Sequence, residues 1–524
     1  MGGFTADTVV CVTGGSGYLG SWLVRKLLGR GCVVHATLRS LADEKKTGLL
    51  RALPGAAERL RLFEADMYDA DTFEPAIAGC HFVFLVATPL AHDLTSTKYK
   101  NTTEAAVDAV RIILRQCERS GTVKRVIQTA SVTAASPLKE DGSGYKDFAN
   151  ESNWTPLNLS YEFSNAHLDD YVWSKSLSEK ELLSYNDESS KDQARPLEVV
   201  TLACALVGGD TIQTYLWSSI PVIVAPLTGQ AIYHNALLFL QALLGSVPLA
   251  HIEDVCEAHV FCMEQASMAG RFLCAAGHPN MRDIVDHFAA KHPDLKVQLT
   301  EVTGEGVRIV PNTSKLEDLG FRFKYGVEET LDCSVEEAFF DYAKHCKILL
   351  DTLYRLLSEA LGLNPSYLID IECNRSQMIL FHYYPPCLEP EVAIGTTQHS
   401  DTGFLTVLLQ DEIGGLQVLQ DDQWIDVPPT PGAFIVNIGD LMQMMSNDKF
   451  RSAEHRVVAK KAGPRVSVAC FTSHSDSTRM YGPIKELLYD ECPPLYRETL
   501  AKDYIAHYYS VGLGRKKAIY DFRL

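Results

Sequence analysis

Three glycines at intervals of three residues, Gly14, Gly17 and Gly20, follow a short apolar run and precede an amphipathic stretch. Such a loop can hold a dinucleotide: Gly14 permits a tight turn, Gly17 lets the backbone approach a pyrophosphate, and Gly20 lets the helix pack on the strand. The N-terminus of that helix offers unpaired N–H groups and a partial positive charge to the phosphates. Glycines alone also fit a plain turn. Between a strand and a helix, this spacing predicts a dinucleotide-binding site.

Cations follow the second apolar run. Sites that prefer NAD usually carry a carboxylate here for the ribose 2′-OH, whereas the guanidinium of Arg39 suits a 2′-phosphate. Lys46 would add a second cation, so we predict NADPH rather than NADH; the alternative is two solvated surface cations. Asp66 closes the third run, and we expect it either to accept a hydrogen bond from the adenine amine or to cap a helix.

Tyr171 and Lys175 form a Tyr-x-x-x-Lys pair, and residues four apart share one face of a helix. A neighbouring ammonium stabilises the phenolate, so the tyrosine becomes a proton donor or acceptor near neutral pH. Ser131 ends an apolar run and can hydrogen-bond the carbonyl of a substrate. The pair alone could lie on the surface. After the complete glycine motif, we predict that all three residues are catalytic.

A second group of candidates lies far along the chain. Residues two apart in a strand point to the same face, so His399 and Asp401 can reach one metal ion, and His455 can arrive from a facing strand. Two imidazoles and one carboxylate leave positions open for a co-substrate and O₂, as in non-haem Fe(II) sites. A solvated loop is the alternative for the His-x-Asp motif by itself.

The residues downstream of His455 favour the metal site. Arg465 and Ser467 share a face by the same period-two rule, and a guanidinium beside a hydroxyl suits the distal carboxylate of a keto acid. Tyr384 could supply another donor to that keto acid. We interpret Asp440, with the methionines that follow it, as a helix cap and core.

The first half of the chain must position the nucleotide site through alternating strands and helices. Short runs rich in β-branched residues predict strands at 9–13, 33–38, 60–65, 82–87, 123–128 and 198–203, with helices such as 19–28 and 103–118 between them. This alternation predicts an α/β doubly wound (Rossmann) unit with a parallel sheet.

From about residue 336 the pattern changes. One helix is predicted at 339–361, stopped by Gly362 and Pro365. Strands are predicted at 378–384, 404–409, 416–419, 424–427, 433–438, 455–459 and 466–471, with a final helix at 494–509. Many short strands with turns predict an all-β sandwich or barrel. We place the domains at 7–335 and 336–524, with the β core at about 375–475.

Composition limits the possible partners. The chain has 524 residues, and its 48 Lys and Arg against 66 Asp and Glu give a net charge of −18. This balance argues against phosphate-driven nucleic-acid binding and against an anionic membrane surface. The most apolar stretch, 216–250, is too interrupted to insert in a membrane, and the N-terminus has no signal-peptide pattern. The 14 cysteines contain no Cys-x-x-Cys pair, so we expect free thiols and a cytoplasmic protein.

Residues 7–335 resemble the extended short-chain dehydrogenase/reductases, close to the plant dihydroflavonol, anthocyanidin and cinnamoyl-CoA reductases. The resemblance rests on TGGSGYLG (13–20), VATP (86–89), HIEDVCEAHVFCME (251–264), SKLEDLGFRFKYG (314–326) and the Ser131, Tyr171 and Lys175 set. It implies that NADPH delivers hydride to a carbonyl or flavylium-type carbon. Tyr171 would then supply the proton, Lys175 would hold the nicotinamide ribose and Ser131 would orient the oxygen.

Residues 336–524 resemble the plant 2-oxoglutarate- and Fe(II)-dependent dioxygenases through YYPPC (383–387), HSD (399–401), SAEHRV (452–457) and RVS (465–467). The resemblance implies a jelly roll (double-stranded β-helix), with iron at His399, Asp401 and His455. It also implies 2-oxoglutarate at Arg465, Ser467 and Tyr384, whose oxidative decarboxylation would drive hydroxylation or desaturation of a small substrate.

Members of that family carry an N-terminal segment before the long helix, and here the reductase takes its place. Missing strands would expose sheet edges and apolar surface. We predict an oxidoreductase fusion that reduces a flavonoid-like or phenolic carbonyl compound and oxidises a small plant metabolite. The alternatives are an active reductase with a vestigial or binding-only dioxygenase half, and two genes joined in one gene model. The oligomeric state stays open.

Overall fold

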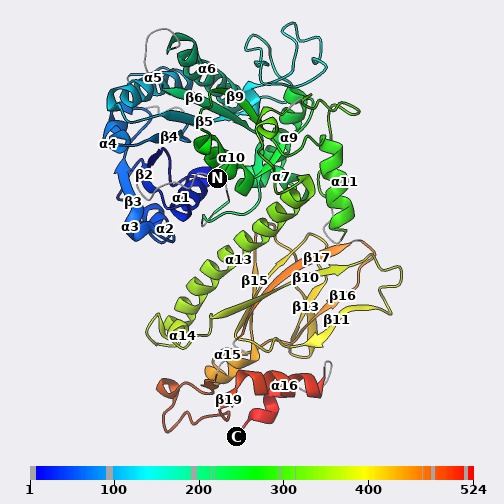
Figure 1. Cartoon of the computed structure of the whole chain (residues 1–524). Coiled ribbons are helices and arrows are strands. Elements are labelled where there is room, and N and C mark those ends of the chain that lie inside the picture. The colour runs from blue at the N-terminus through cyan, green and yellow to red at the C-terminus, as the bar shows by residue number, and fades with distance from the viewer. Residues whose placement is uncertain are drawn as a thin grey trace. The chain divides into compact units, whose positions relative to one another are not determined.

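The computed structural model describes residues 8–89, 98–189, 197–213, 215–216, 219–293, 297–312, 314–462, 464–473, 478–512 and 517–524. Two compact units make up the chain, an N-terminal unit (Met1–Phe339) and a C-terminal unit (Phe340–Leu524) (Figure 1). The proposed boundary at 335/336 falls within one helix, α13 (Val327–Ala360). Residues 1–7, where the signal-peptide prediction and the start of the first domain lie, are outside the described residues.

A seven-stranded parallel sheet forms the centre of the N-terminal unit, in the order β3-β2-β1-β4-β5-β6-β9. The strands are β1 (Val9–Val12), β2 (Val33–Leu38), β3 (Leu60–Glu64), β4 (Phe82–Leu85), β5 (Arg125–Ser131), β6 (Glu198–Cys204) and β9 (Gly270–Cys274). The order reverses between β1 and β4, and ligands of doubly wound sheets bind at the carboxyl ends of strands beside such a reversal. The predicted fold class is confirmed for this unit.

Helices cover both faces of this sheet because successive residues of β1 point to opposite sides. Val10 belongs to a core with α1 (Tyr18–Gly29) and α10 (Ile252–Glu264), whereas Cys11 belongs to a core with α5 (Thr102–Ser120) and α6 (Ala166–Ser189). The remaining elements are α2 (Glu44–Arg51), α3 (Ala56–Arg59), α4 (Glu74–Ile77), α7 (Ser219–Ile223), α8 (Ala225–Thr228), α9 (Ala231–Leu244), α11 (Met281–Lys291), α12 (Lys315–Asp318), β7 (Leu206–Gly208) and β8 (Leu249–His251).

Two antiparallel four-stranded sheets form the C-terminal unit, in the orders β10-β17-β12-β15 and β11-β16-β13-β14. The strands are β10 (Ser376–Tyr384), β11 (Ile394–His399), β12 (Leu405–Gln410), β13 (Leu416–Gln420), β14 (Gln423–Asp426), β15 (Ile435–Ile438), β16 (His455–Val458) and β17 (Arg465–Ser473). The predicted jelly roll is confirmed. Strand β11 was not among the predicted strands.

Helices cover one side of the C-terminal unit, and an apolar core lies between them and the sheet. Tyr354 of α13 is fully buried there with Leu441 of α15 (Asp440–Met445) and Tyr504 of α16 (Ala501–Val511). Helix α16 begins at Ala501 rather than at the predicted residue 494, and α13 begins at Val327 rather than at 339. The smaller elements here are α14 (Tyr367–Asp370), β18 (Met480–Tyr481) and β19 (Thr499–Leu500).

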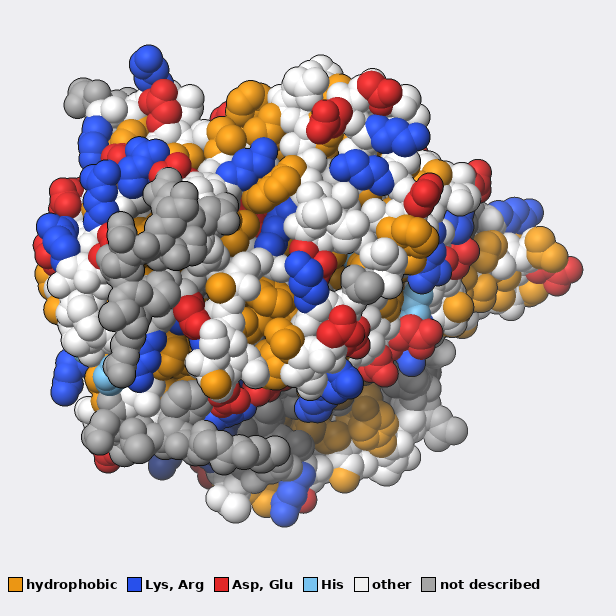
Figure 2. All heavy atoms as spheres, turned by 45° about the horizontal axis from the view of Figure 1, so that its top comes forward, with side chains coloured by type: hydrophobic (Ala, Val, Ile, Leu, Met, Phe, Trp, Pro, Cys, Tyr) orange, Lys and Arg blue, Asp and Glu red, His pale blue; other side chains and the backbone are white. Residues whose placement is uncertain are grey.

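The surface charges and the free cysteines of the structure agree with what the composition predicts. On the face in Figure 2, acidic and basic side chains are interspersed with apolar ones. None of the helices within the described residues combines the length and apolarity that crossing a bilayer requires. The 14 cysteines are free thiols, as expected.

Candidate active sites

A cavity of about 590 Å³ lies in the N-terminal unit, where the glycine loop meets the carboxyl ends of β2 and β5. Its wall brings together most of the residues predicted for this unit: Gly14, Gly17, Gly20, Arg39, Lys46, Ser131, Tyr171 and Lys175. The parallel sheet achieves this because residues distant in sequence all follow carboxyl ends of strands.

The glycines of this loop are required by close backbone contacts. Gly14 has a φ of +64°, and a Cβ on Gly20 would lie 2.1 Å from the Gly14 carbonyl oxygen. Thr37 at the end of β2 fixes the loop, since its hydroxyl accepts a hydrogen bond from Gly14 N at 3.2 Å. No larger side chain could take the place of Gly20 without moving the start of α1.

Gln213 holds the same loop from the far side and was missed in the sequence. Its Nε2 donates to the Ser16 carbonyl at 3.0 Å and lies 2.8 Å from the Ser21 hydroxyl. Gln213 is 4% exposed. No motif marks this contact, because the partners lie almost two hundred residues apart.

The ammonium of Lys175 is held by two oxygens. Its Nζ donates to the Thr88 hydroxyl at 2.8 Å and to the Thr129 carbonyl at 3.1 Å, and it lies 5.9 Å from the centre of the Tyr171 ring. A lysine has three N–H donors, so one remains for a ligand in the cavity. The positive charge is therefore fixed beside Tyr171.

The hydroxyl of Ser131 is oriented by a single neighbour. Its Oγ accepts hydrogen bonds from Thr133 N at 3.2 Å and from Thr133 Oγ1 at 2.9 Å. With these acceptor positions used, the O–H of Ser131 is left to donate. Ser131 lines the cavity, so that donor can serve a substrate oxygen.

A carboxylate side chain, that of Asp43, lies with Arg39 and Lys46 at the end of the cavity near β2. Arg39 is exposed and makes no ion pair within the described residues, whereas Lys46 Nζ lies 3.0 Å from a carboxylate oxygen of Asp43. The hydrogen bond from Lys46 holds the pKa of Asp43 below its ordinary value. Asp66 lies outside the wall: its Oδ1 accepts from Tyr68 N at 2.9 Å in a turn.

The C-terminal unit contains a smaller cavity, of about 60 Å³, whose wall includes every residue predicted for the second site. His399, Asp401 and His455 place one ligand atom each within 4.8 Å of the others. The Nδ1–H of His399 donates to the Thr397 carbonyl at 2.7 Å, and that of His455 to the Ala453 carbonyl at 3.2 Å. Both Nε2 atoms are thereby left as lone pairs, as a metal ligand requires.

Two steps of the prediction for this cluster were wrong. Strand β11 ends at His399, so Asp401 comes from the loop that follows and not from the same strand. His455 arrives from β16, the hydrogen-bonded neighbour of β11, where it pairs directly with His399. The register of β11 shifts between Thr396 and His399, and this irregularity breaks the simple alternation of side chains.

The surroundings of the cluster favour a neutral imidazole at His399. Burial and then the neighbouring His455 lower the pKa of His399. Asn437, on β15, donates a long 3.3 Å hydrogen bond to Asp401 Oδ2 and was missed in the sequence. Its polar side chain between Val436 and Ile438 was the available signal.

Arg465 is a buried cation with neutral partners. It is 2% exposed, and its guanidinium donates to the Gly414 carbonyl at 2.7 Å, to the Ser467 hydroxyl at 2.8 Å and to Gln410 at 3.3 Å. No carboxylate forms an ion pair with it in the described part of the chain, and burial lowers its pKa. Its Cζ lies 5.0 Å from the Tyr384 ring centre. Such a cation is matched by an anionic ligand.

Residues 10–273 match the NAD dependent epimerase/dehydratase family. The chain belongs to this family. Its structure is similar to vestitone reductase from alfalfa (Medicago sativa), which is 30% identical over 63% of this chain and 98% of that chain, with a TM-score of 0.50. Yeast methylglyoxal/isovaleraldehyde reductase complexed with NADPH, 19% identical over 64% of this chain and 100% of that chain, shows the same fold with a TM-score of 0.51.

Residues 375–474 match the 2OG-Fe(II) oxygenase superfamily. Similar proteins are 1-aminocyclopropane-1-carboxylate oxidase homolog 1 of Arabidopsis thaliana, 54% identical over 35% of this chain and 51% of its own length, and deacetoxyvindoline 4-hydroxylase of Catharanthus roseus, 49% identical over 35% and 47%. The chain spans about half the length of the curated relatives it matches. It joins a reductase domain to a dioxygenase domain, and these families use NAD(P)H, and Fe(II) with 2-oxoglutarate.

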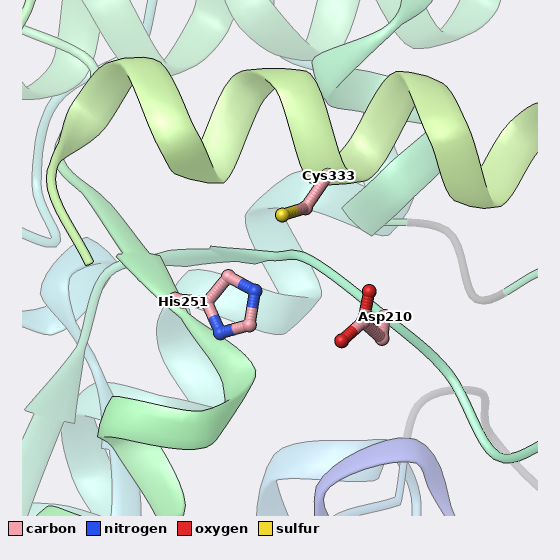
Figure 3. A group of neighbouring side chains, drawn as sticks. All are labelled: Asp210, His251 and Cys333. Atoms are coloured by element: carbon pink, nitrogen blue, oxygen red, sulfur yellow. The ribbon is translucent and has the colours of Figure 1, made fainter. Parts of the chain in front are cut away.

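The reductase domain contains one more group of metal-ligating side chains, Asp210, His251 and Cys333, with ligand atoms within 4.8 Å (Figure 3). His251 Nδ1 already accepts a hydrogen bond from Glu253 N at 3.2 Å, so the neutral ring carries its proton on Nε2. That buried Nε2 makes no hydrogen bond in the described structure. Since a metal needs a lone pair at this position, the cluster does not fit a metal ion.

Proposed function

We propose that the chain is a bifunctional oxidoreductase. The reductase domain uses NADPH to reduce a flavonoid-like or phenolic carbonyl compound, and the dioxygenase domain uses Fe(II) and 2-oxoglutarate to oxidise a small plant metabolite. The observation that carries this proposal is that each domain surrounds its own cavity with a complete set of reactive residues. The free thiols support a cytoplasmic location.

In the reductase cavity, the bound nucleotide supplies hydride. Ser131 donates a hydrogen bond to the substrate carbonyl oxygen and so orients it. Tyr171 then gives that oxygen a proton from its hydroxyl. The ammonium of Lys175, held by Thr88 and Thr129, stabilises the negative charge left on Tyr171.

In the dioxygenase cavity, His399, Asp401 and His455 would hold Fe(II), which supplies O₂ activation coupled to decarboxylation of the keto acid. The buried Asp401 and His455 and the half-buried His399 each offer a free lone pair, and this set of donors fits that ion. Arg465 and Ser467 bind the distal carboxylate of 2-oxoglutarate, and the Tyr384 hydroxyl, which shares a 2.8 Å hydrogen bond with Thr396, lies on the same wall.

Separate readouts on the full-length protein test this proposal. NADPH oxidation and succinate formation are followed while a panel of phenolic carbonyl compounds and small plant metabolites is supplied. His455→Ala is expected to abolish succinate formation and to leave NADPH oxidation intact, and Tyr171→Phe is expected to do the reverse. Equal loss of both activities in either variant would contradict two independent sites.

A second candidate function follows from the length of the relatives. Because the dioxygenase domain has about half of their length, it could bind metal and keto acid without turnover. If the domain binds metal and keto acid but forms no succinate with any substrate in the panel, this second function is favoured. A single transcript that crosses the codons near residue 336 would exclude a joined gene model.

A further inference from the structure

A buried carboxylate lies next to the loop that carries two of the proposed iron ligands. Asp440, the first residue of α15, is 0% exposed. Its Oδ2 accepts hydrogen bonds from the Ser400 hydroxyl at 2.9 Å and from the Tyr504 hydroxyl at 2.6 Å. Neither Asp440 nor Ser400 lines the cavity, so this contact is made outside the site itself.

The backbone brings α15 equally close to that loop. Asp440 N donates to the Asp401 carbonyl at 2.8 Å, and a Cβ on Gly439 would lie 2.2 Å from the Gly403 carbonyl oxygen. Glycine is therefore required at 439 for α15 to start against the metal-binding loop.

Helix α16 reaches the same loop with two tyrosines one turn apart. The Tyr508 hydroxyl donates to the Ser400 carbonyl at 2.9 Å, while Tyr504 reaches Ser400 through Asp440. Tyr504 is fully buried, and its ring packs 5.1 Å from that of Phe522. Ser400, the residue between His399 and Asp401, is thus held by its side chain and by its carbonyl.

We propose that Asp440 is a positioning residue for the iron site, which couples α16 through Tyr504 to the loop of His399 and Asp401. This inference rests on the proposed function of those ligands. Asp440 touches no ligand atom; it fixes the backbone from which both ligands project. Outer partners of this kind commonly change metal affinity by 10-fold or more when they are removed.

The coupling between α16 and the loop of the metal ligands is tested by measuring the metal affinity of the full-length protein. Co(II) is the probe, and its visible absorption spectrum reports the geometry of the ligands around it. Tyr504→Phe is expected to weaken Co(II) binding about 10-fold and to change that spectrum. Asp440→Ala is expected to have a larger effect, which Asp440→Asn partly restores because an amide oxygen can still accept from Ser400. Tyr509→Phe is the matched control on α16, since Tyr509 is 71% exposed.

The outcomes separate the inference from the function on which it rests. If His399→Ala binds Co(II) like the parent protein, the proposed metal site is wrong. If His399→Ala loses Co(II) but Tyr504→Phe keeps the parent affinity and spectrum, the positioning role is overturned, even if the melting temperature falls. Should Asp440→Ala fail to fold, Tyr504→Phe and Tyr508→Phe decide, because each removes one hydroxyl and keeps the aromatic ring.

Discussion

The guanidinium of Arg465 and the hydroxyl of Ser467 lie 2.8 Å apart, two residues from one another on β17 and on the same face. The remaining acceptors of this guanidinium are a carbonyl and an amide. A buried charge whose hydrogen-bond partners are all neutral costs free energy until an anion arrives. Ligand binding should therefore be visible as stabilisation.

2-Oxoglutarate at 100 times its Kd, with the metal present, is expected to raise the free energy of unfolding of the dioxygenase domain by about 2.7 kcal/mol. Arg465→Met should lose this increase, because no cation remains for the distal carboxylate, while the ligand-free variant should be at least as stable as the parent. Thermal melts with and without the keto acid measure both quantities. An equal ligand-induced shift in Arg465→Met would show that another group binds that carboxylate.

The choice between NADPH and NADH is expected to depend on the balance of charge near β2. Arg39→Ala should weaken NADPH binding roughly 10-fold and leave NADH binding almost unchanged, because only the 2′-phosphate is expected to meet the guanidinium. Asp43→Asn should strengthen NADPH binding, since it frees Lys46 and still caps α2. Fluorescence titrations of the parent and of both variants with NADPH and with NADH measure these dissociation constants. Equal losses for both nucleotides in Arg39→Ala would remove the case for 2′-phosphate recognition.

The reductase domain is expected to lose stability in mild acid through His259. Burial lowers the pKa of this histidine from 6.5 to about 4, and its neutral ring donates to the Val255 carbonyl at 2.7 Å and contacts the Thr129 hydroxyl at 2.8 Å. Below about pH 6.5 this histidine is protonated in the unfolded chain, but in the folded protein it is protonated only below about pH 4. The contribution of the neutral ring to the free energy of unfolding is therefore complete above pH 6.5 and is lost as the pH falls from 6.5 to 4.

His259→Gln should therefore show a smaller loss of unfolding free energy between pH 7 and pH 5 than the parent, by about 2 kcal/mol. Urea unfolding followed by tryptophan fluorescence at the two pH values measures the difference. His167→Gln serves as the control because His167 is exposed. Parallel pH profiles for the parent and His259→Gln would contradict a neutral buried imidazole.

Strand β10 forms one edge of its sheet and exposes apolar side chains. We expected such exposure because the reductase takes the place of the N-terminal segment that members of the dioxygenase family carry. Met378, Leu380, Phe381 and Tyr383 are between 41% and 50% exposed. Leu380→Lys is expected to reduce self-association, because a lysine on an edge strand opposes further strand pairing. Sedimentation measures the change, and Gln423→Lys on β14 adds the same charge at an exposed position elsewhere. If both variants associate equally, β10 is not the contact.

Local patterns made much of the fold predictable. The glycine loop, the Tyr171 and Lys175 pair, and Arg465 with Ser467 each need only a few neighbouring residues to be recognised. Strand β11 was missed because Gly395 and two threonines dilute its apolar pattern, and Gly395 is there because a Cβ would lie 2.9 Å from the Tyr384 ring.

Long-range contacts explain the rest of what the sequence did not reveal. Gln213 acts on a loop almost two hundred residues away, and Asp440 meets Ser400 and Tyr504 only after both sheets have formed. The interpretation of Asp440 as a cap could not include these partners. Such contacts depend on tertiary packing, which no short motif encodes.

The two cavities differ about tenfold in volume, 590 Å³ against 60 Å³. The larger one can enclose a nucleotide together with the group it reduces, so its walls can contact most of a bound substrate. The smaller one leaves room for little beyond an ion and a short diacid. A compound oxidised by the dioxygenase domain would then lie mostly outside this cavity, and side chains around the opening of the cavity would discriminate among compounds.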